Sequence, residues 1–212
     1  MSELNRQIIL QRPVQGMPTP EDFELVESPI PQPEAGEVLV RTIYVSLDPY
    51  MRGFMGNEEK VGQVMIGGVT GQVAVSRHPE FQEGQFVCQY VGGYGWQSYG
   101  VVPGEELRVL DPGLVPISTS LGVVGMPGVS AYFCLLEVGK PVAGETVVVS
   151  AASGAVGAVA GQIAKLKKCR AVGIAGSREK CDYVVEELGF DAAVNYRIED
   201  LDAELARTCP AG

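Results

Sequence analysis

The sequence predicts two kinds of structure in one chain: a small β-barrel over residues 1–125, followed by the first β-α-β-α-β half of a doubly wound α/β sheet over residues 126–212. Three observations predict this fold class. Short strand-like runs separated by glycine, proline and aspartate fill the first part. Continuous apolar runs alternate with helix-spaced apolar residues in the second part, and a glycine-rich turn joins its first strand to the following helix.

The first part contains several runs typical of short β-strands. Residues 36–47 (GEVLVRTIYVSL) alternate, which predicts a strand with one face formed by Leu39, Arg41, Ile43, Val45 and Leu47. Further strand-like runs occupy residues 67–76, 84–103 and 106–110. Many short strands with glycine turns favour a small barrel.

The second part alternates helices and buried strands. We expect helices over residues 129–136, 155–168, 178–189 and 198–207, and strands over 146–151, 171–176 and 191–196. The apolar stripe of the first helix is Val129, Tyr132, Phe133 and Leu136, and that of the second is Val156, Val159, Ile163 and Leu166. We expect both stripes to face a core.

The turn SAASGAVG joins the first parallel strand to its helix. Against the dinucleotide pattern G-x-G-x-x-G it has Ala152, Gly154 and Gly157, with the first glycine replaced. Gly154 would let backbone N–H groups approach a pyrophosphate, and Gly157 would allow close packing of helix and strand. The alternative is a tight turn that serves packing alone.

The stretch GIAGSREK lies where a dinucleotide fold recognises the adenosine ribose. An acid here favours NAD, but the chain has Gly176 and Ser177, followed by Arg178 and Lys180. Cations oppose the dipole at a helix N-terminus, whereas a 2′-phosphate would turn them into a binding site. The pattern predicts NADP(H); the alternative is that both cations are merely solvated.

Composition excludes several classes of protein. A net charge of −10 argues against nucleic acid as a partner, and no apolar run approaches the length of a membrane span. The five cysteines have no metal-ligand spacing, and His78 is the single histidine, so we expect no metal site. Reduced cysteines without a secretory signal predict a cytoplasmic protein.

Five motifs carry a family resemblance: DPYMRG, GMPGVSAYF, VVVSAASGAVG, GQIAKLK and GIAGSREK. With them the chain resembles the zinc-independent medium-chain reductases, closest to the prostaglandin reductase and alkenal double-bond reductase family with its curcumin-reductase-like branch. The resemblance implies a GroES-like barrel, a Rossmann domain, and NADPH-dependent reduction of the C=C bond of α,β-unsaturated ketones and aldehydes. Where zinc-dependent relatives have a Gly-His-Glu turn, this chain has GGVTGQV.

The resemblance also assigns residues to the site. It places Gly154, Ala155, Val156 and Gly157 at the pyrophosphate, Lys180 and Tyr196 at the 2′-phosphate, Met126 and Ser130 near the nicotinamide, and Tyr50 in the substrate pocket as the catalytic candidate. The alternative for Tyr50 is a packing role. Cys134 stands where the family has glycine, and we expect it to be buried.

Members of this family continue for three more Rossmann strands, so the resemblance implies an incomplete domain with residues 146–151 as an exposed edge. We expect such a chain alone to associate and to turn over poorly. A quinone reductase and a nucleotide-binding module without turnover stay open as alternatives, and a homodimer is one arrangement we leave open.

Overall fold

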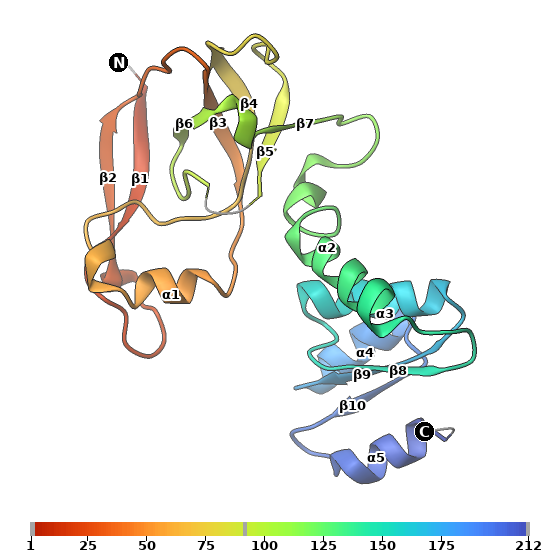
Figure 1. Ribbon diagram of the computed structural model, residues 1–212. Helices are drawn as coiled ribbons and strands as arrows, with labels where there is room; N and C mark the ends of the chain where they lie inside the picture. Colours follow the sequence, from red (N-terminus) through yellow and green to blue (C-terminus); the bar gives the residue numbers. More distant parts are fainter. Residues whose placement is uncertain (1–2, 91–92, 211–212) are drawn as a thin grey trace. The chain divides into compact units, whose positions relative to one another are not determined.

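The computed structural model describes residues 3–90 and 93–210 (Figure 1). The chain divides into two compact units, Met1–Leu121 and Gly122–Gly212. The sequence-based boundary between residues 125 and 126 lies slightly later in the chain, inside the second unit. The functional roles that the sequence assigns to the two parts stay predictions.

The first unit is built from two antiparallel sheets. The larger sheet has the order β6-β3-β4-β5-β7, and the smaller one pairs β1 with β2. Their bounds are β1 (Leu4–Leu10), β2 (Phe23–Pro29), β3 (Glu37–Val45), β4 (Val69–Ser76), β5 (Phe86–Gln89), β6 (Tyr99–Pro103) and β7 (Arg108–Leu110). Isolated bridges from Gln7 to Gln97 and from Ile9 to Val64 link the smaller sheet to the rest, which gives the barrel-like unit that the sequence predicts.

Strand β3 confirms the predicted strand but not its predicted single face. Val38, Leu39 and Val40 are all buried, whereas Ile43, Val45 and Leu47 are exposed. The pairing of β3 with β4 shifts register between Leu39 and Val40 and again after Thr42. Such register shifts change the face of the sheet on which the following side chains lie. Buried and exposed residues therefore do not alternate strictly along the whole strand.

Short helical segments complete the first unit. They are α1 (Met51–Met55), η1 (Pro20–Asp22), η2 (Glu58–Lys60), η3 (Gly104–Glu106) and η4 (Ile117–Leu121). Helix α1 buries Met51, Phe54 and Met55 in a cluster with Leu10 and Met65, so the DPYMRG motif is anchored to the core by its own helix.

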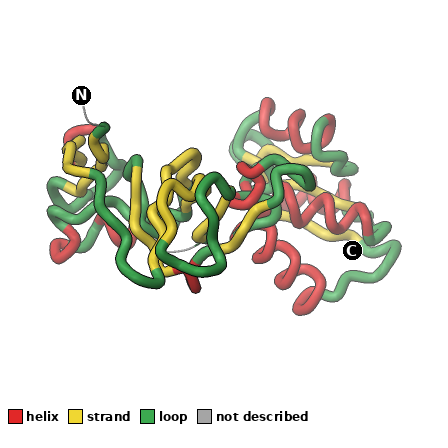
Figure 2. Tube along the Cα trace, turned by 90° about the horizontal axis from the view of Figure 1, so that it is seen from above, coloured by secondary structure: helices red, strands yellow, loops and turns green. Residues whose placement is uncertain are grey.

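The second unit contains a three-stranded parallel sheet with the order β10-β9-β8. Its elements are α2 (Met126–Tyr132), the π-helix η5 (Phe133–Gly139), β8 (Thr146–Val149), α3 (Ala155–Leu166), β9 (Arg170–Ala175), α4 (Arg178–Glu186), β10 (Ala192–Asn195) and α5 (Leu201–Thr208). Helices α3 and α4 lie on one face of this sheet and α5 on the other (Figure 1), and helices flank the strands again in Figure 2. The β-α-β-α-β prediction is therefore confirmed.

The predicted apolar stripe of the first helix in this unit is wrong. Val129, Tyr132 and Phe133 are 51%, 47% and 55% exposed. Helix α2 packs instead through Gly128 and Ala131: a Cβ on Gly128 would lie 1.7 Å from the Val123 carbonyl oxygen. Small residues let the backbone come close, and the large side chains consequently point elsewhere.

Helix α3 shows the same reversal. Val156 and Leu166 of the predicted stripe are exposed, and the buried residues are Gly157, Gly161 and Ala164. The ring of Phe190 lies against Gly161, where a Cβ would come within 1.7 Å of it. The helix therefore lies on the sheet through a stripe of small residues.

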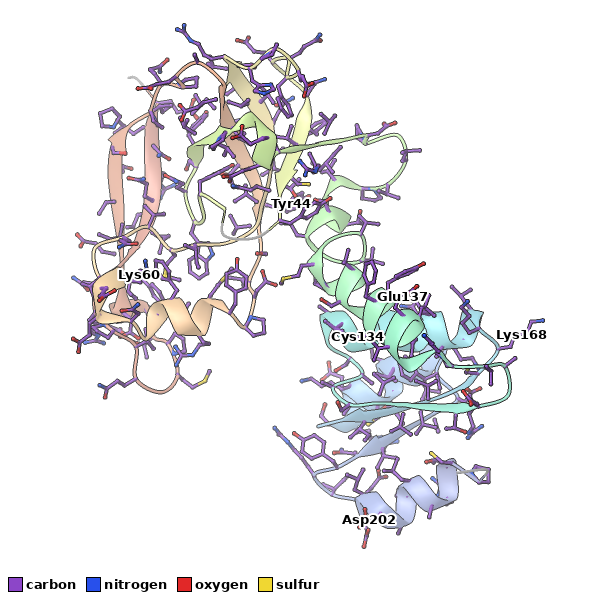
Figure 3. All side chains as sticks on the ribbon, viewed as in Figure 1. Tyr44, Lys60, Cys134, Glu137, Lys168 and Asp202 are labelled. Carbon is purple, nitrogen blue, oxygen red and sulfur yellow. The ribbon has the colours of Figure 1, made fainter. Side chains whose placement is uncertain are left out.

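Cys134 is also placed otherwise than the sequence predicts. It lies in the π-helix η5 and is exposed (Figure 3), so its expected burial is wrong. The expectation came from the small residue that the family has at this position, but the seven residues of the π-helix Phe133–Gly139 include no buried residue.

Strand β8 is the outer strand of the described sheet. In the described residues it pairs with β9 alone, and its Val148 is 44% exposed. This agrees with the edge expected for residues 146–151. An apolar edge strand offers unpaired backbone groups to any further strand.

The pair Lys165–Asp191 fixes helix α3 to the start of β10. The Lys165 ammonium donates to both carboxylate oxygens at 2.6 and 2.8 Å, and the Ala171 backbone N–H donates at 2.7 Å. Burial acts to raise the pKa of Asp191, but the hydrogen bonds from Lys165 and Ala171 outweigh it and lower that pKa.

We expect Asp191→Asn to lower the free energy of unfolding by about 1–2 kcal/mol at neutral pH, because the partly exposed pair loses its charge. The folded-state pKa is lowered, so the stabilisation is full above the ordinary carboxyl range and is lost as the pH falls through the folded-state value. Urea unfolding of both proteins at pH values from about 7 to 3 measures this. Glu187→Gln, an exposed carboxylate of the same unit, is the control. If the free energies of unfolding of the wild type and Asp191→Asn differed by the same amount at all pH values, the lowered pKa of Asp191 would be contradicted.

Candidate nucleotide-binding site

The turn between β8 and α3 is tightly folded. Ala151 has a left-handed backbone with φ of 48°, and its carbonyl oxygen accepts from Gly154 N at 2.8 Å. Ala152 donates from its backbone N–H to Ile174 O at 3.1 Å, which holds the turn to the neighbouring strand. A non-glycine residue at positive φ stores strain, and such residues cluster at binding turns.

The three positions of the dinucleotide pattern have different roles in this turn. The Ala152 side chain is fully buried and packs against Gly173, where a Cβ would lie 2.8 Å from it. Gly154 is the N-cap residue of α3. Gly157 lies so close to the turn that a Cβ there would be 2.4 Å from the Ala151 carbonyl oxygen. The first position is thus a packing position, and the two glycines shape the cradle.

The N-terminus of α3 is open to an anion. Its first turn holds Ala155, Val156 and Gly157, without an acidic residue, and no side chain caps it. The first N–H groups of a helix have no partner within the helix, and its dipole favours negative charge there. These residues can therefore hold a pyrophosphate, as the sequence predicts.

The end of β9 forms the second part of the site. Ser177 is the N-cap of α4, and its Oγ accepts from Lys180 N at 3.3 Å. The Lys180 side chain is exposed. Arg178 Nε lies 3.8 Å from Asp182, one turn along the same helix, and its side chain is 90% exposed. Lys180 is therefore a cation available at this helix terminus.

Residues after β10 close over Gly176. A Cβ on Gly176 would lie 3.2 Å from the Tyr196 hydroxyl and 3.3 Å from Arg197 Nε. The structure thus brings Tyr196 beside Gly176, and the contact of Tyr196 with a 2′-phosphate that the resemblance implies stays a prediction. It adds Arg197, which the sequence reasoning missed. The one signal for Arg197 was its place next to Tyr196 at the end of the third strand.

Cys181 lies on α4, the helix that begins at this site. Burial, with the charges of Glu199 and Asp182, raises the pKa of its thiol, which disfavours the thiolate that a nucleophilic role would need.

The remaining predicted residues lie at other places. Met126 and Ser130 are half-buried on α2 in the second unit. Tyr50 belongs to the first unit, at the N-cap of α1, and packs against the cluster around Leu10 and Met51. Their placement beside a nicotinamide and a substrate stays a prediction.

Over the described ranges 3–90 and 93–210, no cluster of three or more His, Cys, Asp or Glu side chains could hold a metal ion. Within the same ranges no helix has the length and apolar character to cross a membrane.

A parallel sheet with a glycine turn at its first strand and an acid-free end at its second is typical of dinucleotide-binding folds, and a barrel-like unit precedes it in the chain. Residues 6–110 match the family model described as the N-terminal domain of oxidoreductase. The chain belongs to the medium-chain reductase family.

Relatives and solved structures support this membership. The NADPH-dependent curcumin reductase of Escherichia coli is 46% identical, over 98% of this chain and 61% of that protein. Prostaglandin reductase 1 of Oryctolagus cuniculus is 43% identical, over 96% and 58%. The structure of CurA in complex with NADPH from Vibrio vulnificus has a TM-score of 0.87 at 45% identity, over 98% and 62%. The chain thus spans about three fifths of the length of these relatives.

Proposed function

We propose that the chain binds NADP(H) and forms part of an enzyme that reduces the C=C bond of α,β-unsaturated ketones and aldehydes without zinc. The observation that carries the cofactor is the end of β9, where Gly176 and Ser177 replace the acid that would select NAD. Lys180 and Tyr196 flank that position. Relatives named as curcumin, prostaglandin and 2-alkenal reductases support the reaction class.

The residues present fit this cofactor. The cradle of Gly154 and Gly157 is one that a side chain would fill, and the first turn of α3 presents free backbone donors to a pyrophosphate. Lys180 and Tyr196 would hold the 2′-phosphate. The bound cofactor supplies a hydride for the β-carbon of the enone. The protein's own part is to orient the cofactor and the carbonyl and to exclude water.

The finer parts of the proposal concern the whole protein. We propose a small enone or enal as substrate and a cytoplasmic location, with a homodimer as one arrangement. They rest on the family resemblance.

Reduction of a simple enone tests the reaction. In the enzyme of which we propose this chain to form part, we expect NADPH oxidation that depends on but-3-en-2-one and yields the saturated ketone. Turnover of quinones in place of enones would favour the quinone reductase. Cofactor binding without turnover of either would favour the nucleotide-binding module.

Tyr50 provides a second test of the proposal. In the turnover-competent enzyme we expect Tyr50→Phe to lower kcat roughly 10-fold or more, because a positioned hydroxyl would polarise the carbonyl, as a general acid does. The affinity for NADPH should not change. Steady-state kinetics with a cofactor titration measures both. Unchanged kcat would leave Tyr50 as a packing residue of the cluster around Leu10 and Met51.

A further inference from the structure

A phenol hydroxyl and a guanidinium, both from the segment after β10, lie over one glycine at the end of β9. A Cβ on Gly176 would meet the Tyr196 hydroxyl oxygen at 3.2 Å and Arg197 Nε at 3.3 Å. The Arg197 guanidinium carbon lies 5.9 Å from the centroid of the Tyr196 ring, within the range of a cation–π contact. Two donors suited to an anion therefore gather at the ribose end of the dinucleotide unit.

Backbone hydrogen bonds fix the segment that carries these two side chains. Tyr196 N donates to Ala175 O at 3.2 Å, so Tyr196 continues the alignment of β10 with β9. Arg197 N donates to the side-chain oxygen of Asn195, also at 3.2 Å. The position of Arg197 relative to Gly176 thus follows from the fold of the strand end.

We infer that Arg197 is the second cation for the 2′-phosphate of NADPH and, with Lys180, determines the preference for NADPH over NADH. This inference rests on the proposed function. The planar guanidinium presents parallel N–H donors in a fixed fork that matches two phosphate oxygens, whereas an ammonium acts as a compact point charge. Arg197 thereby takes the helper role that the sequence gave to Arg178.

The charges at this end of the sheet favour Arg197 over Arg178. The Arg178 guanidinium already faces the Asp182 carboxylate at 3.8 Å. The Glu199 carboxylate accepts from Asn195 N at 2.6 Å and so remains close to the end of β10. A phosphate bound here meets this negative charge, which Lys180 alone would have to offset. A second cation next to Gly176 would offset the negative charge of Glu199 beside the bound phosphate.

The test compares two nucleotides that differ in one phosphate, 2′,5′-ADP and 5′-AMP, by isothermal titration of the 212-residue chain. Neither probe needs contacts to a nicotinamide. We expect Arg197→Gln to weaken 2′,5′-ADP about 10-fold, the range of a lost hydrogen bond to a charged group, and to leave 5′-AMP within 2-fold. Arg197→Lys, which keeps the charge, should recover part of the loss. Lys167→Gln, which removes an exposed cation at the end of α3, is the control and should change either affinity less than about 2-fold.

The outcomes distinguish a failure of the proposed NADP(H) binding from a failure of the role inferred for Arg197 alone. A wild-type chain that binds 2′,5′-ADP no tighter than 5′-AMP contradicts the NADP assignment and, with it, the role of Arg197. A wild-type preference that Arg197→Gln retains overturns the inference alone. Equal losses for both nucleotides, or altered far-UV circular dichroism of both Arg197 variants, would assign Arg197 to the fold and also overturn it.

Discussion

Lys180→Ala is expected to weaken NADPH binding about 10- to 100-fold and to leave NADH unchanged, because a hydrogen bond to a charged group contributes about 1.5–3 kcal/mol. Lys180 occupies the first turn of α4, where Ser177 caps the helix and its dipole favours an anion. Its ammonium would share the 2′-phosphate with the turn. NADH has no such phosphate, so the mutation removes nothing from its binding.

Fluorescence titration of both cofactors measures this difference. Lys167→Ala, an exposed lysine at the end of α3, is the matched control and should affect neither cofactor. Raising the salt concentration should weaken NADPH more than NADH, because screening acts on the exposed phosphate pair. Equal losses for both cofactors would mean that Lys180 supports the fold and not the phosphate.

Gly157→Ala is expected to lower both the stability of the second unit and its affinity for nucleotide. The added Cβ would lie 2.4 Å from the Ala151 carbonyl oxygen and 3.0 Å from the Ala152 Cα. Both are main-chain atoms, and the Ala151 carbonyl oxygen already accepts a hydrogen bond from Gly154 N. The turn must therefore move as a whole, at a cost of about 1–3 kcal/mol, the range of an overpacking substitution.

Thermal unfolding and titration with 2′,5′-ADP measure the two effects. The matched control is Gly139→Ala in the same unit, where the added Cβ would lie at an ordinary 3.4 Å from the nearest carbonyl oxygen. We expect Gly139→Ala to keep both the melting temperature and the affinity. A Gly157→Ala protein that matched the wild type in both would show that the turn is looser than the structure has it.

The order of elements in the second unit could be predicted because buried parallel strands and helices differ in their apolar period. The runs at 146–151, 171–176 and 191–196 became β8, β9 and β10 in the expected order. The buried faces of the helices could not be predicted in this way. Periodicity follows large apolar side chains, whereas α2 and α3 pack through Gly128, Gly161 and their small neighbours.

The candidate site was predictable only where a backbone requirement leaves a trace in the sequence. Gly157 marks the turn because a Cβ there would lie 2.4 Å from the Ala151 carbonyl oxygen, and a Cβ on Gly154 would lie 3.1 Å from the same atom. Ala152 replaces the first glycine of the pattern, and its side chain is buried against Gly173, where it contributes packing. Arg197 left no such trace, since an exposed arginine after a strand is common and its approach to Gly176 depends on the pairing of β10 with β9.

Nuclear magnetic resonance can map where 2′,5′-ADP and 5′-AMP bind on the chain. If the three strand ends hold the nucleotide, 2′,5′-ADP shifts the backbone amide signals of residues 154–157, 176–180 and 196–197. The difference between 2′,5′-ADP and 5′-AMP is then confined to residues 176–180 and 196–197, where the 2′-phosphate would lie. Equal shifts with both nucleotides, or shifts outside the turns after β8, β9 and β10, would contradict this placement.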